Sequence, residues 1–423
     1  MKKRLVFLIL ILFLFILKAT AESNQITPEN FEYLGAFRLP YIDGEVRWDW
    51  GGTGATYYPG NNSLYAIGHD HTMHVSEVSI PKPVKSRNLA DLKTAQTLRS
   101  FTNVRTGVGQ LDEMFERATI RRAGIAYLND KLYLSFGAHF QEEEQNIPSH
   151  MSCNLDFSKP AGAWRVAGDP LLYSSNDYMC EIPASWADEN VSTRGKYLAT
   201  GRFRDGGWGG EGPNLFAIAP WQDGNPPKNG ATLNSVRLLG YSSTHPSGYD
   251  FAKGHQMKNY HHADEWVGAE WLTANDKSAV IFVGTKGLGD CWYGFSDGTA
   301  YPTDGSPFHG SVPPYPHDDR GWWSSSYEAQ IIFYDPADLA KVAQGKMKPY
   351  EPQPYATMNL DQYLYNIDKI NDPNFRPEQN KYRLASCAYD RTRNLLYVIE
   401  YRGEPAGGDW NDDNPVVHVF GVK

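Results

Sequence analysis

Five side chains that carry or can gain a positive charge recur at equivalent positions of a repeated sequence pattern. Each follows a short apolar run, and they are His69, His139, Arg202, Lys286 and Arg402. If folding brought these groups together, they would repel one another unless something balanced them. Acidic side chains of the protein could do this as structural ion pairs, or an acidic ligand could. The sequence leaves both alternatives open.

Acidic residues that could serve as partners precede the first apolar run of several repeats. They are Asp49, Glu116, Asp177 and Asp264. Glycoside hydrolysis also requires two carboxyl groups, held at a set separation across the glycosidic bond. We therefore treat Asp49, Asp177 and Asp264 as candidate catalytic carboxylates.

A second chemistry fits the basic residues. Elimination from a uronate needs a cation for the carboxylate, a base for the C5 proton and an acid for the leaving oxygen. The candidate cations are Arg202, Arg204 and Lys286, and the candidate bases are His139 and His262. Tyr178 is the candidate acid.

The segments between the apolar runs also hold tryptophans that could stack on sugar rings, and they are Trp208, Trp292, Trp322 and Trp323. The glycine-rich stretch around Trp208 lacks the Gly-Lys-Ser/Thr ending of a phosphate-binding loop. The chain also has no Gly-x-Ser-x-Gly elbow, so serine-type hydrolysis has no support.

Histidines raise the question of a metal ion. His261 and His262 with Asp264 could bind a metal or act as acid and base, and His71 with His74 is a weaker candidate. The sequence identifies no metal and no certain cofactor. A structural or catalytic divalent ion, Ca²⁺ or Zn²⁺, is compatible with it.

The elements that must position these residues recur five times. Hairpins of two apolar runs are expected at 55–68, 124–137, 182–201, 269–284 and 385–400. A third apolar segment follows each hairpin, at 75–81, 153–160, 214–220, 330–336 and 416–422. A fourth follows at 97–101, 164–167, 236–241 and 355–360, but the last copy has none. The segment 31–38 at the other end of the chain can supply it.

This pattern predicts an all-β chain that forms a single β-propeller of five four-stranded blades, closed by the N-terminal strand joining the C-terminal blade. Residues 285–327 are rich in Gly, Pro, Ser and Trp and are expected to form a long loop. Strands hidden there would raise the blade count to six or seven. The links from the second to the third strand of each blade, and the links that enter the first strand of the next blade, lie on the same face of the propeller. We expect the functional residues on this face.

Residues 1–21 have the basic, apolar and small-residue regions of a secretory signal peptide. We expect 22–423 to be one propeller domain, secreted or periplasmic, without a membrane span after cleavage. The net charge of −9 argues against nucleic acid as a partner. Export permits disulfides, and three pairings are open to Cys153, Cys180, Cys291 and Cys387.

In architecture the chain resembles the five-bladed propeller carbohydrate-active enzymes, such as the arabinanase and invertase-like glycosidases. The resemblance rests on the blade count and on Asp49, Asp177 and Asp264, which would lie at axial ends of innermost strands, where those enzymes hold catalytic carboxylates. It includes no specific family motif, and it implies an extracellular polysaccharide or oligosaccharide as the partner.

The working hypothesis is a polysaccharide lyase that cleaves an acidic glycan, bearing uronate or sulfate, by β-elimination in the central funnel. One alternative is a glycoside hydrolase that uses paired Asp or Glu at the propeller axis. The other is a non-enzymatic glycan-binding or surface scaffold protein.

Overall fold

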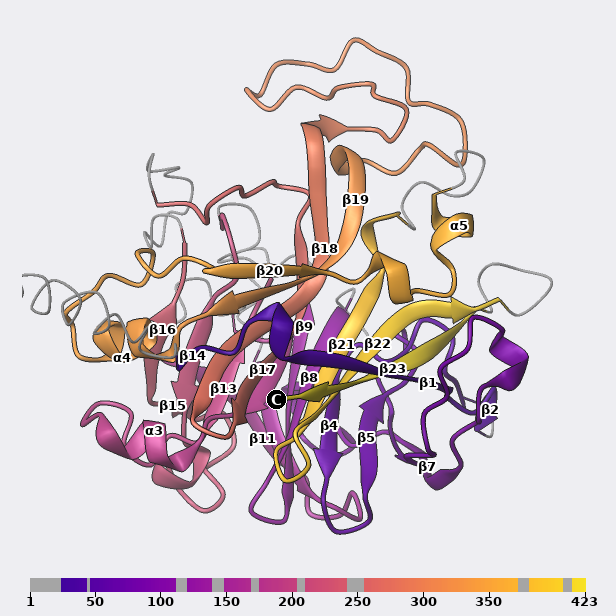
Figure 1. Ribbon diagram of the computed structural model, residues 1–423. Coiled ribbons are helices and arrows are strands. Elements are labelled where there is room, and N and C mark those ends of the chain that lie inside the picture. Colours follow the sequence, from indigo (N-terminus) through magenta and orange to yellow (C-terminus); the bar gives the residue numbers. More distant parts are fainter. Residues whose placement is uncertain are drawn as a thin grey trace, which may run out of the picture.

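The computed structural model describes residues 24–43, 46–111, 120–138, 148–168, 175–203, 210–241, 255–371, 380–405 and 413–423. At 42, 43, 46, 120, 121 and 138 only the backbone is described. These residues form an all-β fold in which five four-stranded antiparallel sheets are arranged as the blades of a propeller (Figure 1). The predicted fold class is confirmed. The expected signal peptide, 1–21, lies outside the described residues.

Four blades follow the chain in order, from the innermost strand outward. The first comprises β4 (Ala55–Tyr58), β5 (Ser63–Ile67), β6 (Val75–Ser79) and β7 (Thr97–Thr102). The second comprises β8 (Ile120–Leu128), β9 (Lys131–Ala138), β10 (His150–Asn154) and β11 (Ala161–Val166). The third comprises β12 (Tyr178–Glu181), β13 (Leu198–Gly201), β14 (Leu215–Ile218) and β16 (Ser235–Leu239). The fourth comprises β17 (Glu265–Ala274), β18 (Lys277–Gly294), β19 (Gly321–Tyr334) and β20 (Ala356–Asn359).

The fifth blade closes the ring with both ends of the chain. It contains β21 (Leu384–Asp390), β22 (Leu395–Glu404), β23 (Asn414–Val422) and, outermost, β1 (Phe31–Arg38). Strands β1 and β23 pair along their whole length, from Phe31 opposite Val422 to Arg38 opposite Val416. A chain of polar contacts links β1 to the inner strands of this blade. The half-buried Tyr33 Oη lies 3.1 Å from His418 Nδ1, and the buried His418 Nε2 lies 2.9 Å from Glu400 Oε2. The predicted closure is confirmed.

Short elements cover the links between strands. Strand β15 (Thr232–Leu233) pairs in parallel with β11, and β2 (Ile42–Asp43) pairs with β3 (Val46–Arg47). The helices are α3 (Ala184–Glu189), α4 (Pro336–Ala343) and α5 (Ile367–Ile370), with 3-10 turns η1 (Pro28–Asn30), η2 (Leu89–Asp91), η3 (Pro220–Gln222) and η4 (Asp361–Tyr363). Within the described chain, no helix is long and apolar enough to cross a bilayer.

The hydrophobic core consists of layers between neighbouring blades. Phe282 of the fourth blade and Leu215 of the third belong to one buried cluster, and Ile331 of the fourth blade and Val398 of the fifth belong to another. Equivalent clusters join the first blade to the second and the fifth, and the second to the third. Since each blade contributes apolar side chains from both faces of its sheet, its strands read as nearly continuous apolar runs.

The innermost strands meet so closely that glycine is required between them. A Cβ atom on Gly54 would lie 2.5 Å from the Ala123 carbonyl oxygen, and one on Gly124 would lie 2.6 Å from the Tyr178 carbonyl carbon. The cavity that remains along the axis has a volume of only about 10 Å³. The central funnel expected from the sequence is therefore closed at this level, and a ligand must bind above it or between blades.

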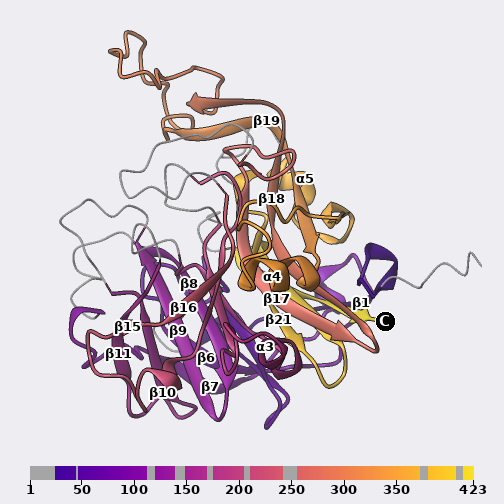
Figure 2. The same ribbon diagram turned by 90° about the vertical axis from the view of Figure 1, so that its left-hand side faces the viewer.

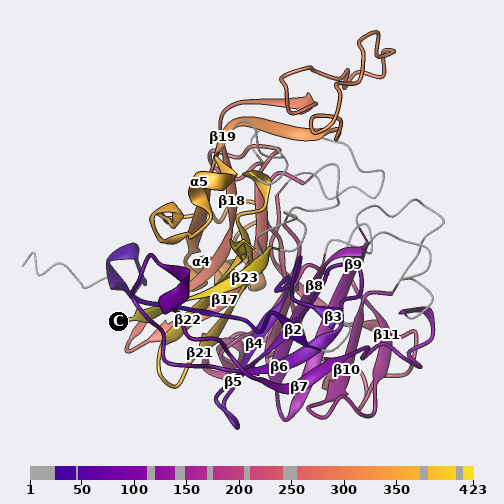
Figure 3. The same ribbon diagram turned by 90° about the vertical axis from the view of Figure 1, so that its right-hand side faces the viewer.

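The segment 285–327 differs from the expected loop. Strands β18 and β19 continue beyond the blade as a two-stranded arm, from Lys286 opposite Glu328 to Gly294 opposite Gly321. Cross-strand aromatic pairs, Trp292 with Trp323 and Tyr293 with Trp322, stabilise this ribbon outside the sheet. Figures 2 and 3 show that the arm turns over at its far end, above the ends of the strands. It adds no sixth blade to the described chain.

The four cysteines are free thiols. Cys153, Cys180 and Cys387 are buried, whereas Cys291 is exposed on the arm. The disulfides that export would permit are not formed in this structure.

Candidate functional site

The loops with unusual side chains gather on the face from which the arm rises, at the top of Figure 1, here called the arm face. This follows from the topology, because links after second strands and before first strands end on the same side of every blade. Four of the candidate residues named from the sequence, Glu116, His139, Arg204 and Trp208, lie outside the described residues.

Two of the predicted cations form ion pairs with the predicted acids. The pairs are Lys286 Nζ with Asp264 Oδ1 at 2.8 Å and Arg202 Nε with Asp177 Oδ2 at 3.4 Å. His69 Nε2 lies 3.7 Å from Asp49 Oδ2, but burial lowers the pKa of His69, so this imidazole is neutral at neutral pH. In the third blade, Asp177 directly precedes β12 and Arg202 directly follows β13. In the fourth blade, Asp264 directly precedes β17, and Lys286 lies on β18 next to Thr285, the partner of Glu265. These positions face each other across an antiparallel pair. The alternative of structural ion pairs is therefore supported for Lys286 and Arg202.

Both carboxylate oxygens of Asp264 accept hydrogen bonds from the protein. Its Oδ1 accepts hydrogen bonds from Lys286 Nζ at 2.8 Å and from the Gly287 amide at 2.9 Å. Its Oδ2 accepts one from the His261 amide at 3.0 Å. Burial raises the pKa of Asp264 to about 6, although Lys286 opposes this. Because Asp49 and Asp177 are also buried and paired, we assign none of the three a role at a glycosidic bond.

Tyr178 is likewise part of the blade. Its buried hydroxyl lies 2.7 Å from the carbonyl oxygens of both Arg202 and Asn214. Burial raises the pKa of this phenol well above its usual value. We therefore assign Tyr178 a structural role, because its hydroxyl holds two segments of the arm face together.

Arg402, the fourth described cation of the set, packs on aromatic rings. Its guanidinium carbon lies 4.4 Å from the centre of the Trp50 ring and 5.4 Å from that of Tyr401. Such cation–π contacts stabilise a positive charge without neutralising it.

One pair at the axis has no counterpart among the predicted residues. Arg122 on β8 and Glu265 on β17 form an ion pair in which Nη2 lies 2.5 Å from Oε2. The Arg122 guanidinium also contacts the rings of Phe203 and Tyr382. The sequence signal is modest: two charges of opposite sign stand just before Gly124 and Gly268, the axial glycines of their strands.

The predicted tryptophans of the arm attach it to the arm face. Trp322 stacks on His262, with ring centres 4.2 Å apart and planes inclined by 22°. Lys381 Nζ lies 3.4 Å above the Trp323 ring. Trp292 donates a hydrogen bond from Nε1 to the Phe295 carbonyl at 2.9 Å. Trp322, Trp323 and His262 thus hold the arm in place.

A cleft of about 570 Å³ lies beside the Lys286–Asp264 pair, between the link 257–261 and strands β18, β19 and β20. We call it the blade-four cleft, and the lining residues that carry chemistry are Lys258, Tyr260, His261, Lys286, Gln330 and Tyr355. Its volume is within the range of small-ligand sites. No Asp or Glu is among its described lining residues, and its charged lining residues are Lys258 and Lys286, of which Lys286 is paired with Asp264 behind it.

His261 lies in this cleft with one ring nitrogen engaged, because Nδ1 is 3.3 Å from Ser324 Oγ. Burial, and then the nearby Lys286 charge, lower the pKa of His261. The imidazole is therefore neutral at neutral pH, and Nε2 is the nitrogen that could act on a ligand. The sequence indicated His261 as a metal ligand or as an acid or base, but its place in this cleft depends on how the link 257–261 packs beside β18.

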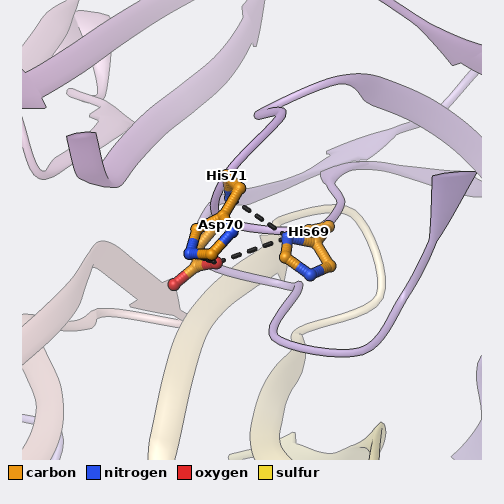
Figure 4. A group of neighbouring side chains, drawn as sticks. All are labelled: His69, Asp70 and His71. Atoms are coloured by element: carbon orange, nitrogen blue, oxygen red, sulfur yellow. Dashed lines mark hydrogen bonds and ion pairs between the residues drawn. The ribbon is translucent and has the colours of Figure 1, made fainter. Parts of the chain in front are cut away.

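A second group lies on the first blade, where His69, Asp70 and His71 converge in one turn (Figure 4). Their ligand atoms all lie within 4.8 Å of one another. Among the described residues, this set meets that spacing, whereas the predicted sets with His74 or with His261 and His262 do not.

Comparisons with known proteins identify no family for this chain. No protein-family model matches the chain, and no curated protein matches it. Among solved structures, a luciferin-regenerating enzyme is similar over 94% of each chain, at 8% identity and a TM-score of 0.33. A candidate glycosidase from Bacteroides thetaiotaomicron VPI-5482 is similar over 94% of each chain, at 10% identity and a TM-score of 0.36. The five-bladed architecture is clear, but at these TM-scores no specific family follows.

Proposed function

We propose that the chain binds an acidic glycan in the blade-four cleft and cleaves it by β-elimination. The observation that supports this is the composition of the cleft, which has two lysines, one histidine and two tyrosines but no carboxylate among its described lining residues. Hydrolysis requires two carboxyl groups at the scissile bond. Elimination requires a cation, a base and an acid, and these are residue types that line this cleft.

Lys286 and Lys258 are the proposed partners of the uronate carboxylate. The Lys286 ammonium donates to Asp264 Oδ1 and to the Gly287 carbonyl, each at 2.8 Å, so its third hydrogen can point to a ligand. Lys258 is exposed at the rim. Positive charge at the carboxylate stabilises the negative charge that develops when C5 loses its proton.

His261 is the proposed base and Tyr260 the proposed acid. The neutral imidazole takes the C5 proton at Nε2, the electron pair of the C5–H bond forms the C4–C5 double bond, and the C4–O bond breaks. The leaving oxygen receives a proton from the Tyr260 hydroxyl. That hydroxyl lies 2.9 Å from the Gly210 carbonyl oxygen and 3.3 Å from His262 Nδ1. His262 could therefore return a proton to the phenolate.

An extracellular polysaccharide as substrate agrees with export to the periplasm or medium, which the amino-terminal sequence favours. Tyr355 adds an aromatic wall to the cleft, against which a sugar ring could stack. Its hydroxyl bonds the Ile26 carbonyl at 2.6 Å, so it serves as a fixed platform.

The test is a panel of uronate-containing and sulfated glycans, assayed in parallel for ultraviolet absorbance of an unsaturated product and for new reducing ends. We expect absorbance from at least one uronate glycan. We expect His261→Gln and Tyr260→Phe to lower kcat by about 100-fold or more. Lys258→Gln should mainly raise KM, and the matched control is Lys228→Gln, an equally exposed lysine on a distant link.

Each other result would contradict the proposal in its own way. Reducing ends without absorbance would identify a hydrolase, and glycan binding without either product would identify a binding protein. Unchanged activity in a folded His261→Gln variant would show that the reaction does not use His261 as its base in the blade-four cleft. Thermal unfolding of each variant shows whether it is folded.

A further inference from the structure

We propose that His69, Asp70 and His71 bind one divalent first-row transition metal ion on the arm face of the first blade. This proposal concerns a different blade from the blade-four cleft and does not rest on the proposed function. The three residues lie in a tight turn that follows β5. Within this turn, the amides of Thr72 and Met73 donate to the His69 carbonyl at 3.0 and 2.8 Å.

The turn brings three ligand atoms of suitable type to one side. His69 Nδ1 lies 3.4 Å from Asp70 Oδ1, and His71 Nε2 lies 3.8 Å from the same oxygen (Figure 4). In a tetrahedral zinc site, bonds of about 2.0–2.1 Å place ligand atoms roughly 3.3 Å apart. The pair of His69 and Asp70 already has this spacing. Only the His71 ring must move closer, and its side chain is 75% exposed and can rotate.

The residues behind His69 resemble the outer shell of known metal sites. A metal-bound histidine usually directs its other ring nitrogen to a carboxylate or carbonyl, which sets its orientation. Here Asp49 Oδ2 lies 3.7 Å from His69 Nε2, on the side away from Asp70. The Trp50 ring lies nearly parallel to the imidazole, with planes inclined by 13° and ring centres 6.3 Å apart. The side chain is thus already oriented for binding.

The neighbouring groups and the ligand types determine the expected affinity and the choice of ion. The His71 amide donates to His69 Nδ1 at 3.1 Å, so a metal ion must replace this hydrogen bond. The carboxylates of Asp49 and Asp70 favour a cation, while Arg47, 3.4 Å from Asp49, and Arg402, stacked on Trp50, oppose it. Two imidazoles and one carboxylate favour Zn²⁺ or Co²⁺ over Ca²⁺, which prefers oxygen ligands. Three protein ligands would leave a coordination position open for water or a ligand oxygen.

The experiment uses the full chain without a histidine tag, freed of metal by chelation. Titration with Co²⁺, followed by its visible absorption, and with Zn²⁺ by calorimetry should each show about one ion per chain, with Ca²⁺ showing no binding. His69→Ala and His71→Ala should each weaken Zn²⁺ binding at least tenfold. Asp49→Asn should weaken it by about 10–100-fold, the usual effect of an outer-shell change. The control His309→Ala removes an exposed histidine of the arm and should leave binding unchanged.

Three results would overturn the proposal. These are no Co²⁺ or Zn²⁺ binding, binding that survives both His69→Ala and His71→Ala, or binding of Ca²⁺ in place of Zn²⁺. Because His71 is exposed, His71→Ala should fold normally. A loss of binding in that variant, with an unchanged unfolding temperature without metal, therefore reports on the ligand itself.

Discussion

Glu265 Oε2 and Arg122 Nη2 lie 2.5 Å apart at the mouth of the propeller axis, although their strands belong to blades that are not neighbours in the ring. The side chains are only 15% and 14% exposed, for Arg122 and Glu265 respectively. The pair thus joins the second and fourth blades over the closed axis. An ion pair with so little solvent contact is costly to break on one side only.

Arg122→Met should therefore destabilise the protein by about 3–5 kcal/mol, because Glu265 keeps an uncompensated charge. The double variant Arg122→Met with Glu265→Gln should recover part of this loss. Urea unfolding of both single variants and the double variant gives the coupling free energy. Additive effects would show that the two groups do not interact in solution.

His150 makes stability depend on pH in the acidic range. It is buried between the second and third blades, with Ser149 Oγ and Thr200 Oγ1 each 2.8 Å from a ring nitrogen. Burial lowers the pKa of His150 to about 3, so the unfolded chain takes up a proton at higher pH than the folded one. Its contribution should be complete above about pH 6.5 and fall by about 1.4 kcal/mol per unit as the pH drops toward 3. His150→Gln should remove this slope, measured as the wild-type minus variant unfolding free energy at each pH. Parallel curves would contradict the assignment.

Glu270 should make the folding stability fall as the pH rises, which is the opposite of the effect of His150. Burial raises the pKa of this β17 carboxyl to about 8, with Arg391 opposing and Glu181 adding to the shift. The folded state therefore holds a proton that the unfolded state loses near pH 4.5, so stability should fall as the pH rises from about 4.5 to 8. Glu270→Gln should stabilise the protein at pH 8 and change little at pH 4.5. Glu189→Gln, at an exposed carboxyl on α3, is the control and should give no such trend.

Gly124→Ala should test the packing of the innermost strands. A Cβ there would lie 2.6 and 2.7 Å from backbone atoms of Tyr178 and Met179, which cannot move independently of β12. We expect a loss of about 1–3 kcal/mol, as for other overpacked sites. Gly421→Ala is the matched strand control, because its nearest neighbour would be Leu34 Cδ1 at 3.6 Å. Equal stability of the two variants would show that the strands can separate at the axis.

The fold was predictable because its signals are local. Apolar runs separated by turn residues recur along the chain, and the expected closing segment 31–38 has the bounds of β1. The arm was missed because glycines and the irregular pairing between Leu288 and Cys291 interrupt its alternation. Even so, its aromatic residues were singled out in advance.

The candidate site was less predictable because it depends on distances between blades. The acids and bases that pair within one blade, such as Asp264 and Lys286, follow from strand register. The pairing of Arg122 with Glu265 does not, since it crosses the axis. The position of His261 in the blade-four cleft likewise depends on tertiary packing of a link without regular structure.

The pairing of β1 with β23 means that the ring has no preferred starting point. The Lys423 amide donates to the Asn30 carbonyl at 2.9 Å, so a short linker could join Lys423 to the residue that directly precedes β1. New ends could then be cut at the far end of the arm, where residues 303–307 lie in a surface loop. Such a circular permutant would keep every strand pair of the five blades. The seam of the ring would become a continuous peptide, and the order in which the blades are synthesised would change while their arrangement stayed the same.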